Sequence, residues 1–476
     1  MFSKGNKDIQ RLLVDSHSLS DLSSVIALLS WDQEVNMPSK GGAARAKQLA
    51  TLSEIFHNKL ISLKLPKVKT NNIYDLALIR EMTKAKNRAK KIPTSLIKEF
   101  SETISLAQQD WQRAKKMNKF EVFAPSLKKV IKLKLQMAKL LKSKGQTLYD
   151  VMLDEFEPGL SETEISLVFN KIKIDLSKRV SELKVLTQNA DKRIANKKFE
   201  VGTKVIFDMG YDLAAGRIDR SAHPFTTTFD RNDVRITTWE NKRDFRPKLY
   251  ATIHEAGHAL YEQGLNPELD RLYLGEGGGL SGGVGMAMHE SQSRLWENMI
   301  GRSEEFCNKY LSPETFKVVN VIKPSPVRVE ADEVSYGLHI IIRFEIEREL
   351  INGQIKVEDL PKIWREKYKK YLGIIPKNDA EGTLQDIHWA HGAFGYFPNY
   401  FLGSLIASQL LNTAKKQIDI YNFKLLREWL RKNIHQYGRI YTTKELLLKI
   451  TGEDLNPRYF LDYIDQKFTK MYNLSK

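Results

Sequence analysis

The chain has 476 residues, of which 42% are hydrophobic and 10% aromatic, and its formal net charge is +17. This composition predicts an ordinary packed globule, and only 15 prolines argue against long linkers. The single cysteine, Cys307, excludes an intramolecular disulfide, so we expect a cytoplasmic protein. The N-terminal residues lack the apolar core of a signal peptide, and no apolar run approaches the roughly 20 residues of a membrane span, so we expect no membrane partner.

The excess positive charge is densest in two lysine-rich segments, 84–91 and 127–145. In residues 127–145 the apolar side chains recur at helical spacing and the lysines lie mostly on the other face, which predicts a solvated helix. A phosphate-binding surface would favour arginines interleaved with aromatic residues. We therefore expect no nucleic-acid partner.

The region from Lys7 to about Glu200 is predicted to be almost wholly helical, because apolar residues recur every three or four positions. Helix breaks are expected at residues 37–42, 64–72, 91–95 and 156–164. In the last of these, Ser161 and Glu164 have the spacing of a capping box that would begin the next helix.

Residues 223–239 have a different pattern, because threonines and β-branched residues alternate there around the turn signal at 230–233. This pattern predicts a β-hairpin just upstream of a helical segment. Strand periodicity places Arg235 and Thr237 on the face opposite Val234 and Ile236. The edge of such a hairpin could bind a peptide backbone by adding it as a strand.

The segment ATIHEAGHALYEQG, residues 251–264, carries His254 and His258 four positions apart in a predicted helix. This spacing stacks both imidazoles on one face, so that their ring nitrogens can converge on one metal ion. Glu255 projects to the side, where it can reach a water that the metal activates. The pattern predicts a zinc peptidase, and a pair of structural helix histidines is the alternative interpretation.

A catalytic zinc ion needs a third protein ligand. The candidates are Glu262 on the same helix, Glu276 in a glycine-rich loop, and Glu290 at the start of the next helix. We favour Glu290, because a helix holds a ligand more rigidly than a glycine loop does. Ser293 and Arg294 lie within one turn and could hydrogen-bond its carboxylate.

Residues 275–285 contain seven of the 27 glycines of the chain, which predicts a flexible loop beside the active site. We expect it to move when substrate binds. The helix that follows, at 288–300, is predicted to be amphipathic. From about Pro326 to the end, the pattern is again helical.

The developing oxyanion of peptide hydrolysis needs a hydrogen-bond donor besides the metal. The candidates are His388, Tyr396 and Tyr400, each of which could equally be a buried aromatic side chain.

An exopeptidase must also bind the free C-terminal carboxylate, for which an arginine fork is suited. Arg235 and Arg343 are the two candidates, with Arg328 and Arg439 next. The alternative for Arg235 is a surface charge on the hairpin. The alternative for Arg343 is an ion pair with Glu347 within one largely buried helix.

Six motifs occur in order along the chain: HPF at 223–225, DVRIT at 233–237, HEAGH at 254–258, HESQ at 289–292, VRVEAD at 327–332 and GTLQDIHW at 382–389. With the flanking SWDQEVNMPSKGGAARAKQLATLSEI and GEDLNPRYFLDYI segments, they resemble the carboxypeptidase Taq family of metallocarboxypeptidases over nearly the whole chain. The connection that contains GEGGGLSGGVG is about six residues longer than in the family.

The resemblance implies a mostly α-helical cleft protein of neurolysin-like architecture, with a small β-hairpin or sheet beside the metal-binding helix. Residues 1–476 would form a single unit, in which about 1–200 make one wall or lid of the cleft and about 201–476 the catalytic part. It also implies a homodimer. By the family's motifs, His254, His258 and Glu290 match the metal ligands, and Glu255 matches the catalytic glutamate.

The implied activity is stepwise release of C-terminal amino acids from peptides, with broad preference and poor action at proline. Zinc is the implied metal, and cobalt could substitute for it. Two other functions are considered: an endo-acting oligopeptidase with the same chemistry, and a basic binding protein whose metal site is vestigial.

Overall fold

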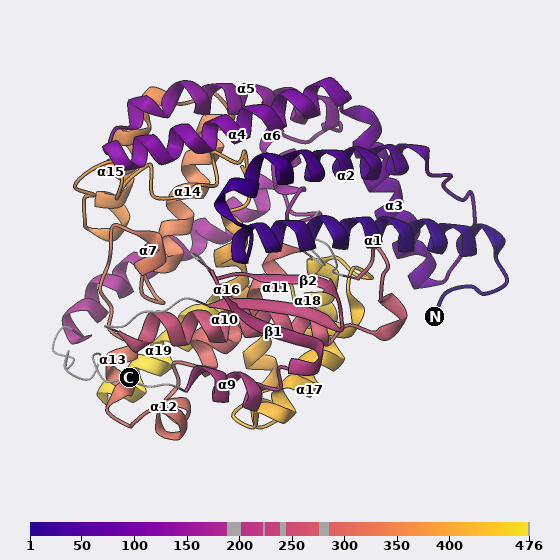
Figure 1. The fold of residues 1–476 in the computed structure, drawn as a ribbon. Coiled ribbons are helices and arrows are strands. Elements are labelled where there is room, and N and C mark those ends of the chain that lie inside the picture. Colours follow the sequence, from indigo (N-terminus) through magenta and orange to yellow (C-terminus); the bar gives the residue numbers. More distant parts are fainter. Residues whose placement is uncertain (188–200, 222–223, 239–243, 276–284, 475–476) are drawn as a thin grey trace. The chain divides into compact units, whose positions relative to one another are not determined.

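The computed structural model describes residues 1–187, 201–221, 224–238, 244–275 and 285–474 (Figure 1). Helices make up most of these residues, and a three-stranded sheet is the largest β-structure among them. The prediction of a mostly helical fold with a small sheet is therefore confirmed.

The chain divides into two compact units, and each is assembled from segments that are distant in sequence. The first unit comprises residues 1–90, 192–319 and 410–454. The second comprises residues 91–191, 320–409 and 455–476. The N-terminal helical region thus contributes to both units, and the expectation that 1–476 acts as one functional unit stays a prediction.

The first unit contains the sheet and most of the shorter helices. Its described helices are α1 (Lys7–Val35), α2 (Gly42–Ser62), α3 (Ile73–Lys91), α9 (Gly202–Met209), α10 (Phe245–Gln263), α11 (Met286–Arg294), α12 (Glu304–Tyr310), α13 (Thr315–Val319), α17 (Phe423–Asn433) and α18 (Thr443–Thr451).

The described residues of the second unit contain helices and loops but no strand. Its helices are α4 (Thr94–Met117), α5 (Ala124–Leu141), α6 (Leu148–Leu153), α7 (Glu162–Thr187), α14 (Tyr336–Ile351), α15 (Leu360–Leu372), α16 (Pro398–Ala414, which runs into the first unit) and α19 (Arg458–Tyr472).

The helix breaks expected from sequence are confirmed, since each of the four ranges overlaps a gap between consecutive helices. The capping box at the start of α7 is also present. The Ser161 hydroxyl accepts from the Glu164 backbone N–H at 3.2 Å, and the Ser161 N–H donates to the Glu164 carboxylate at 3.0 Å. These reciprocal bonds satisfy two N–H groups that an uncapped helix would leave without partners.

The predicted hairpin forms from β2 (Thr226–Asp230) and β3 (Asp233–Thr238), which pair antiparallel. The sheet also contains a strand that the sequence analysis missed, β1 (Gly216–Arg220), which pairs parallel with β3. The strand order is β1-β3-β2, so β2 is an edge strand. Val234 and Ile236 are fully buried and Arg235 is half-buried, as the alternation predicted, but Thr237, expected on the same face as Arg235, is also fully buried. His223, at the start of the HPF motif, lies outside the described residues.

The expectation that no apolar segment approaches the length of a membrane span is wrong for helix α1. An 18-residue window within it has a mean hydropathy of 1.3, which by length and composition alone is enough to cross a membrane. The sequence analysis missed it because serines interrupt the apolar residues. One face of α1 packs into the core of the first unit through Leu12, Leu19 and Ile26. Core helices of ordinary globular proteins meet the same criterion.

Candidate metal centre

Helix α10 carries the histidine pair and lies beside the sheet and α11 (Figure 1). Its first turn is capped by Asp244, whose carboxylate accepts from the Arg246 N–H at 2.9 Å. The ring centroids of His254 and His258 are 4.9 Å apart, as expected for positions one turn apart on one face.

Glu290 of α11 completes a convergent set with these histidines. Its Oε2 lies 3.7 Å from Nε2 of His254 and 3.3 Å from Nε2 of His258. One donor atom from each of the three residues lies within 4.8 Å of the others. Two imidazoles and one carboxylate match the donor set of a catalytic zinc site, so these residues fit a divalent metal ion.

Of the two other carboxylates considered as ligands, only Glu262 belongs to the described residues, and it lies outside this set. Glu262 Oε1 is 2.8 Å from Nε2 of His289, and Glu262 is not part of the convergent set. Glu276 belongs to the segment 276–284, which lies outside the described residues, as does most of the predicted glycine-rich loop at 275–285.

Gly257 allows α10 and α11 to approach closely enough for this convergence. A Cβ atom at position 257 would lie 2.7 Å from the Ser293 Cα and 2.9 Å from the Gln292 carbonyl oxygen. Both are backbone atoms, which cannot move aside as a side chain can.

We expect Gly257→Ala to separate α10 from α11, destabilising the protein by about 1–3 kcal/mol and weakening metal binding. Thermal unfolding and zinc titration measure the two effects. Gly202→Ala is the control, because a Cβ there would meet Thr252 side-chain atoms at an ordinary 3.8–3.9 Å. Parent-like metal affinity in Gly257→Ala would contradict this account.

Carboxylate and guanidinium groups orient the candidate ligands. Nδ1 of His254 lies 2.9 Å from Glu297 Oε2, which leaves Nε2 to face Glu290. Arg294 donates from Nε to Glu290 Oε1 at 2.7 Å, as the sequence analysis expected. The Ser293 hydroxyl instead donates to the Glu290 backbone carbonyl at 2.7 Å, so that part of the expectation is wrong. Such outer contacts fix ring orientation and ligand basicity in metal sites.

Burial and nearby charges set the protonation of this cluster. Burial lowers the pKa of His258 from 6.5 to about 4, which keeps its imidazole neutral and able to bind a metal. Burial also lowers the pKa of His254, but the Glu290 and Glu297 carboxylates outweigh it and raise the pKa above 6.5. Burial raises the pKa of Glu290, yet Arg294 and the two histidines lower it well below its usual range.

Glu255 is buried next to the histidine pair, with 7% of its surface exposed. The Thr226 hydroxyl, on strand β2, donates to Glu255 Oε2 at 2.7 Å. Burial is the largest effect on the pKa of Glu255 and raises it above 4.5. A desolvated carboxylate with a raised pKa is a better proton acceptor than an exposed one.

The helix after the glycine-rich segment is not amphipathic, contrary to prediction. Every residue from 287 to 300 is buried except Glu297, which is half-buried. Its polar side chains face inward and bond within the cluster, which a hydrophobic pattern cannot distinguish from a solvent-exposed face. At Leu295–Ile300 the chain becomes π-helical, a distortion that is frequent at functional sites.

Arg235 lies in the same unit, where one carboxylate and two aromatic rings contact its guanidinium. Its guanidinium bonds both oxygens of Asp233, each at 2.8 Å, and stacks 4.5 Å from the Trp31 ring and 4.8 Å from Phe229. A role of Arg235 in binding the substrate carboxylate stays a prediction. The backbone N–H of Arg439 donates to the Leu274 carbonyl at 2.9 Å.

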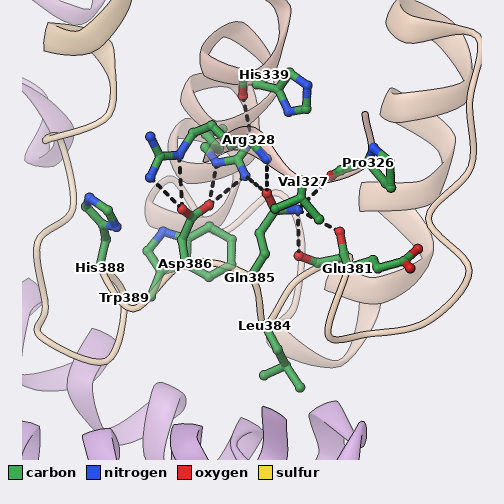
Figure 2. A network of polar contacts seen from close by, with 12 residues as sticks. Pro326, Val327, Arg328, His339, Glu381, Leu384, Gln385, Asp386, His388 and Trp389 are labelled. Atoms are coloured by element: carbon green, nitrogen blue, oxygen red, sulfur yellow. Dashed lines mark hydrogen bonds and ion pairs between the residues drawn. The ribbon is translucent and has the colours of Figure 1, made fainter. Parts of the chain in front are cut away.

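Arg343 lies in the second unit and is fully buried, as predicted, but its partner is not Glu347. Its Nε and Nη2 donate to Asp386 Oδ2 at 2.7 and 2.6 Å. Arg328 donates to the other oxygen, Oδ1, from Nε at 3.0 Å and Nη2 at 2.9 Å. Figure 2 shows the Asp386 carboxylate between guanidinium groups, with Gln385 beside it.

Glu347 is used for a different purpose. Its carboxylate accepts from the Tyr149 hydroxyl at 2.8 Å, the Trp389 indole at 2.8 Å and the Gly395 N–H at 3.0 Å. The intrahelical pair considered for Arg343 is therefore wrong, and Glu347 instead ties together three segments of the second unit.

The candidate oxyanion donors form one aromatic group in the second unit. Nε2 of His388 lies 3.2 Å from the Tyr400 hydroxyl, and the Tyr396 and Tyr400 rings are 5.3 Å apart. Burial is the main cause that lowers the pKa of His388 to about 3, so this imidazole is neutral. A role of these three residues in substrate binding stays a prediction.

The sequence analysis missed Thr226, Glu297, His289 and Asp386. Glu297 could have been predicted from sequence, because it lies seven positions after Glu290 and so on the same helix face. His289 adjoins Glu290 in the HESQ motif and could have been considered because of that position. Thr226 and Asp386 are brought to their partners by long-range packing and have no local signal.

Comparisons with known proteins match this chain to one family over nearly its whole length. The profile of the family described as "Carboxypeptidase Taq (M32) metallopeptidase" matches residues 11–468. The chain is 36% identical to "Thermostable carboxypeptidase 1" of Pyrococcus furiosus, covering 97% of this chain and 99% of that protein. It is 35% identical to "Carboxypeptidase 1" of Bacillus subtilis, covering 96% and 97% respectively.

Solved structures give the same result for the fold. The structure titled "Structure of Pyrococcus furiosus Carboxypeptidase Apo-Mg" superposes with a TM-score of 0.91 at 34% identity, over 98% of this chain and 99% of that chain. The M32 carboxypeptidase of Deinococcus radiodurans superposes with a TM-score of 0.92 at 30% identity, over 98% and 100%. The chain therefore belongs to the carboxypeptidase Taq (M32) family of metallopeptidases, and it is a metallocarboxypeptidase that acts on peptides with a divalent metal ion.

Proposed function

We propose that this carboxypeptidase holds one zinc ion with His254, His258 and Glu290 and releases amino acids one at a time from peptide C-termini, with broad preference. The observation that carries the proposal is the convergence of the three side chains within 4.8 Å. Two imidazole nitrogen donors and one carboxylate suit zinc, and the same set could accept cobalt.

When bound, zinc supplies the Lewis acidity that activates water and polarises the scissile carbonyl. Glu255 accepts the proton of the attacking water and returns it to the departing amine, because its buried carboxylate is adjacent to the ligands. Thr226 holds Glu255 Oε2 and so limits the carboxylate to one orientation. We further propose that His388, Tyr396 or Tyr400 donates to the developing oxyanion.

Incubating zinc-loaded protein with a free-acid peptide tests the proposal. Mass spectrometry should show a ladder of successive C-terminal losses, and the same peptide with an amidated C-terminus should resist. A chelator should abolish the ladder and added zinc should restore it. Internal fragments from both peptides would instead identify an endo-acting oligopeptidase.

Removing the carboxylate ligand should remove the metal. We expect Glu290→Ala to bind zinc at least 100-fold more weakly and to lose activity, because two histidines leave a catalytic site incomplete. Metal content after gel filtration measures the first effect. A stoichiometric zinc content in Glu290→Ala would point to another carboxylate, such as Glu276.

Arg235 is the arginine that we propose for binding the substrate carboxylate. Arg343 is fully buried and its donors are engaged by Asp386, Gln385, Tyr368 and its own helix. Arg235 is half-buried, and its Nε and Nη2 bond a single carboxylate, that of Asp233. Arg235→Lys should raise KM for free-acid peptides by an amount equivalent to about 1.5–3 kcal/mol, and the preference over amides should shrink in parallel. Discrimination equal to the parent's would remove Arg235 from this role.

Assembly is proposed from the family resemblance, and location from the cysteine content. We propose a homodimer, which light scattering of the purified chain would test. We also propose a cytoplasmic location, supported by a cysteine content of one, Cys307, which is buried.

A further inference from the structure

A chain of hydrogen bonds leads away from His258, on the side opposite the candidate metal ligands. Nδ1 of His258 lies 2.6 Å from Nδ1 of His289, and Nε2 of His289 lies 2.8 Å from Glu262 Oε1. Glu262 and His289 are buried, with 3% and 9% of their surfaces exposed. A buried carboxylate at this position is costly unless it stabilises a donor.

The proton order in this chain follows from the geometry. A metal ion at Nε2 of His258 requires a lone pair there, so the proton of the neutral ring is on Nδ1. That N–H donates to Nδ1 of His289, whose own proton must then be on Nε2. Nε2–H in turn donates to the Glu262 carboxylate. Reversing the order would place a proton on Nε2 of His258 and block the metal.

We propose that His289 and Glu262 are positioning residues, which fix the tautomer and ring orientation of His258 so that Nε2 faces the metal. This inference rests on the proposed metal set. Glu262, which the sequence analysis considered as a metal ligand, would then act as an anion that orients His289, and His289 in turn orients His258. It also gives the two histidine ligands separate supports, since His254 is held by Glu297.

The neighbouring His435 provides a matched control. Its ring and that of His289 both pack on Tyr261, with centroids 5.2 and 4.7 Å away. Nε2 of His435 contacts Gln292 Oε1 at 2.9 Å, and no hydrogen bond joins it to His258. A substitution at His435 therefore perturbs the same packing without breaking the chain.

The test measures zinc dissociation constants of the full chain by competition with a chromogenic chelator, beside thermal melting of the metal-free protein. Glu262→Gln, which keeps the side-chain volume, should weaken zinc binding about 10- to 100-fold. His289→Phe should weaken it at least as much, and His289→Asn, whose oxygen can accept from His258, should recover part of the loss. His435→Gln should bind zinc as the parent does.

The outcomes separate this inference from the proposed function. If the parent binds no zinc, or His258→Ala binds it unchanged, the proposed metal set fails. If the parent binds zinc and His258→Ala does not, but Glu262→Gln matches the parent, only the positioning role is overturned. An equal loss in His435→Gln would also overturn it, because packing would then explain the effect. If Glu262→Gln does not fold, the zinc affinities of His289→Phe and His289→Asn are compared instead, and equal affinities would overturn the positioning role.

Discussion

Glu255→Gln is expected to bind zinc as tightly as the parent and to lose about 10²- to 10⁴-fold in kcat, with KM little changed. The amide matches the carboxylate in shape but cannot accept the proton of the attacking water. His254, His258 and Glu290 stay in place, so the metal site is intact. Metal analysis and steady-state kinetics on one peptide measure both quantities.

Thr226→Val is the companion variant for this prediction. It removes the hydroxyl that donates to Glu255 Oε2 at 2.7 Å and keeps the β-branched shape that suits strand β2. A smaller loss, about 10-fold in kcat, is expected, because the base remains but its carboxylate is less restrained. Parent-like turnover in Glu255→Gln would exclude Glu255 as the base.

Asp386→Ala is expected to destabilise the protein by about 3–5 kcal/mol, the cost of leaving buried charges without a partner. Asp386 neutralises part of the charge of Arg328 and of Arg343, and Arg343 is fully buried. Burial raises the pKa of Asp386, but the two arginines outweigh it and hold the pKa far below its usual range. The carboxylate is thus ionised at neutral pH.

Urea unfolding of parent and variant measures this effect. The control is Glu366→Ala, which removes an exposed i,i+4 pair with Lys362 in the same unit and should cost less than about 0.5 kcal/mol. Asp386→Asn should fall between the two, since the amide oxygen can accept from one arginine. Equal midpoints for Asp386→Ala and Glu366→Ala would show that the two arginines find other partners.

Several features of this protein were predictable from sequence because their causes are local. His254 and His258 share a face through the helical repeat alone, and Ser161 with Glu164 form a capping box across one turn. The hairpin of β2 and β3 follows from strand alternation around a turn. Glu290 could be favoured as third ligand because a helix restrains its side chain. The family resemblance came from motifs in fixed order.

Only the tertiary structure decided which distant groups meet. Strand β1 pairs with β3, which lies more than ten residues later in the chain, and local periodicity cannot predict such a pairing. Glu262 and Glu290 are both helix carboxylates near the histidines in sequence. Where α10 and α11 approach closely at Gly257, Glu290 faces His254 and His258, whereas Glu262 faces His289. Arg343 pairs with Asp386 instead of Glu347, because the fold brings the distant Asp386 carboxylate next to this buried charge. Sequence spacing identifies only the neighbours of Arg343 on its own helix.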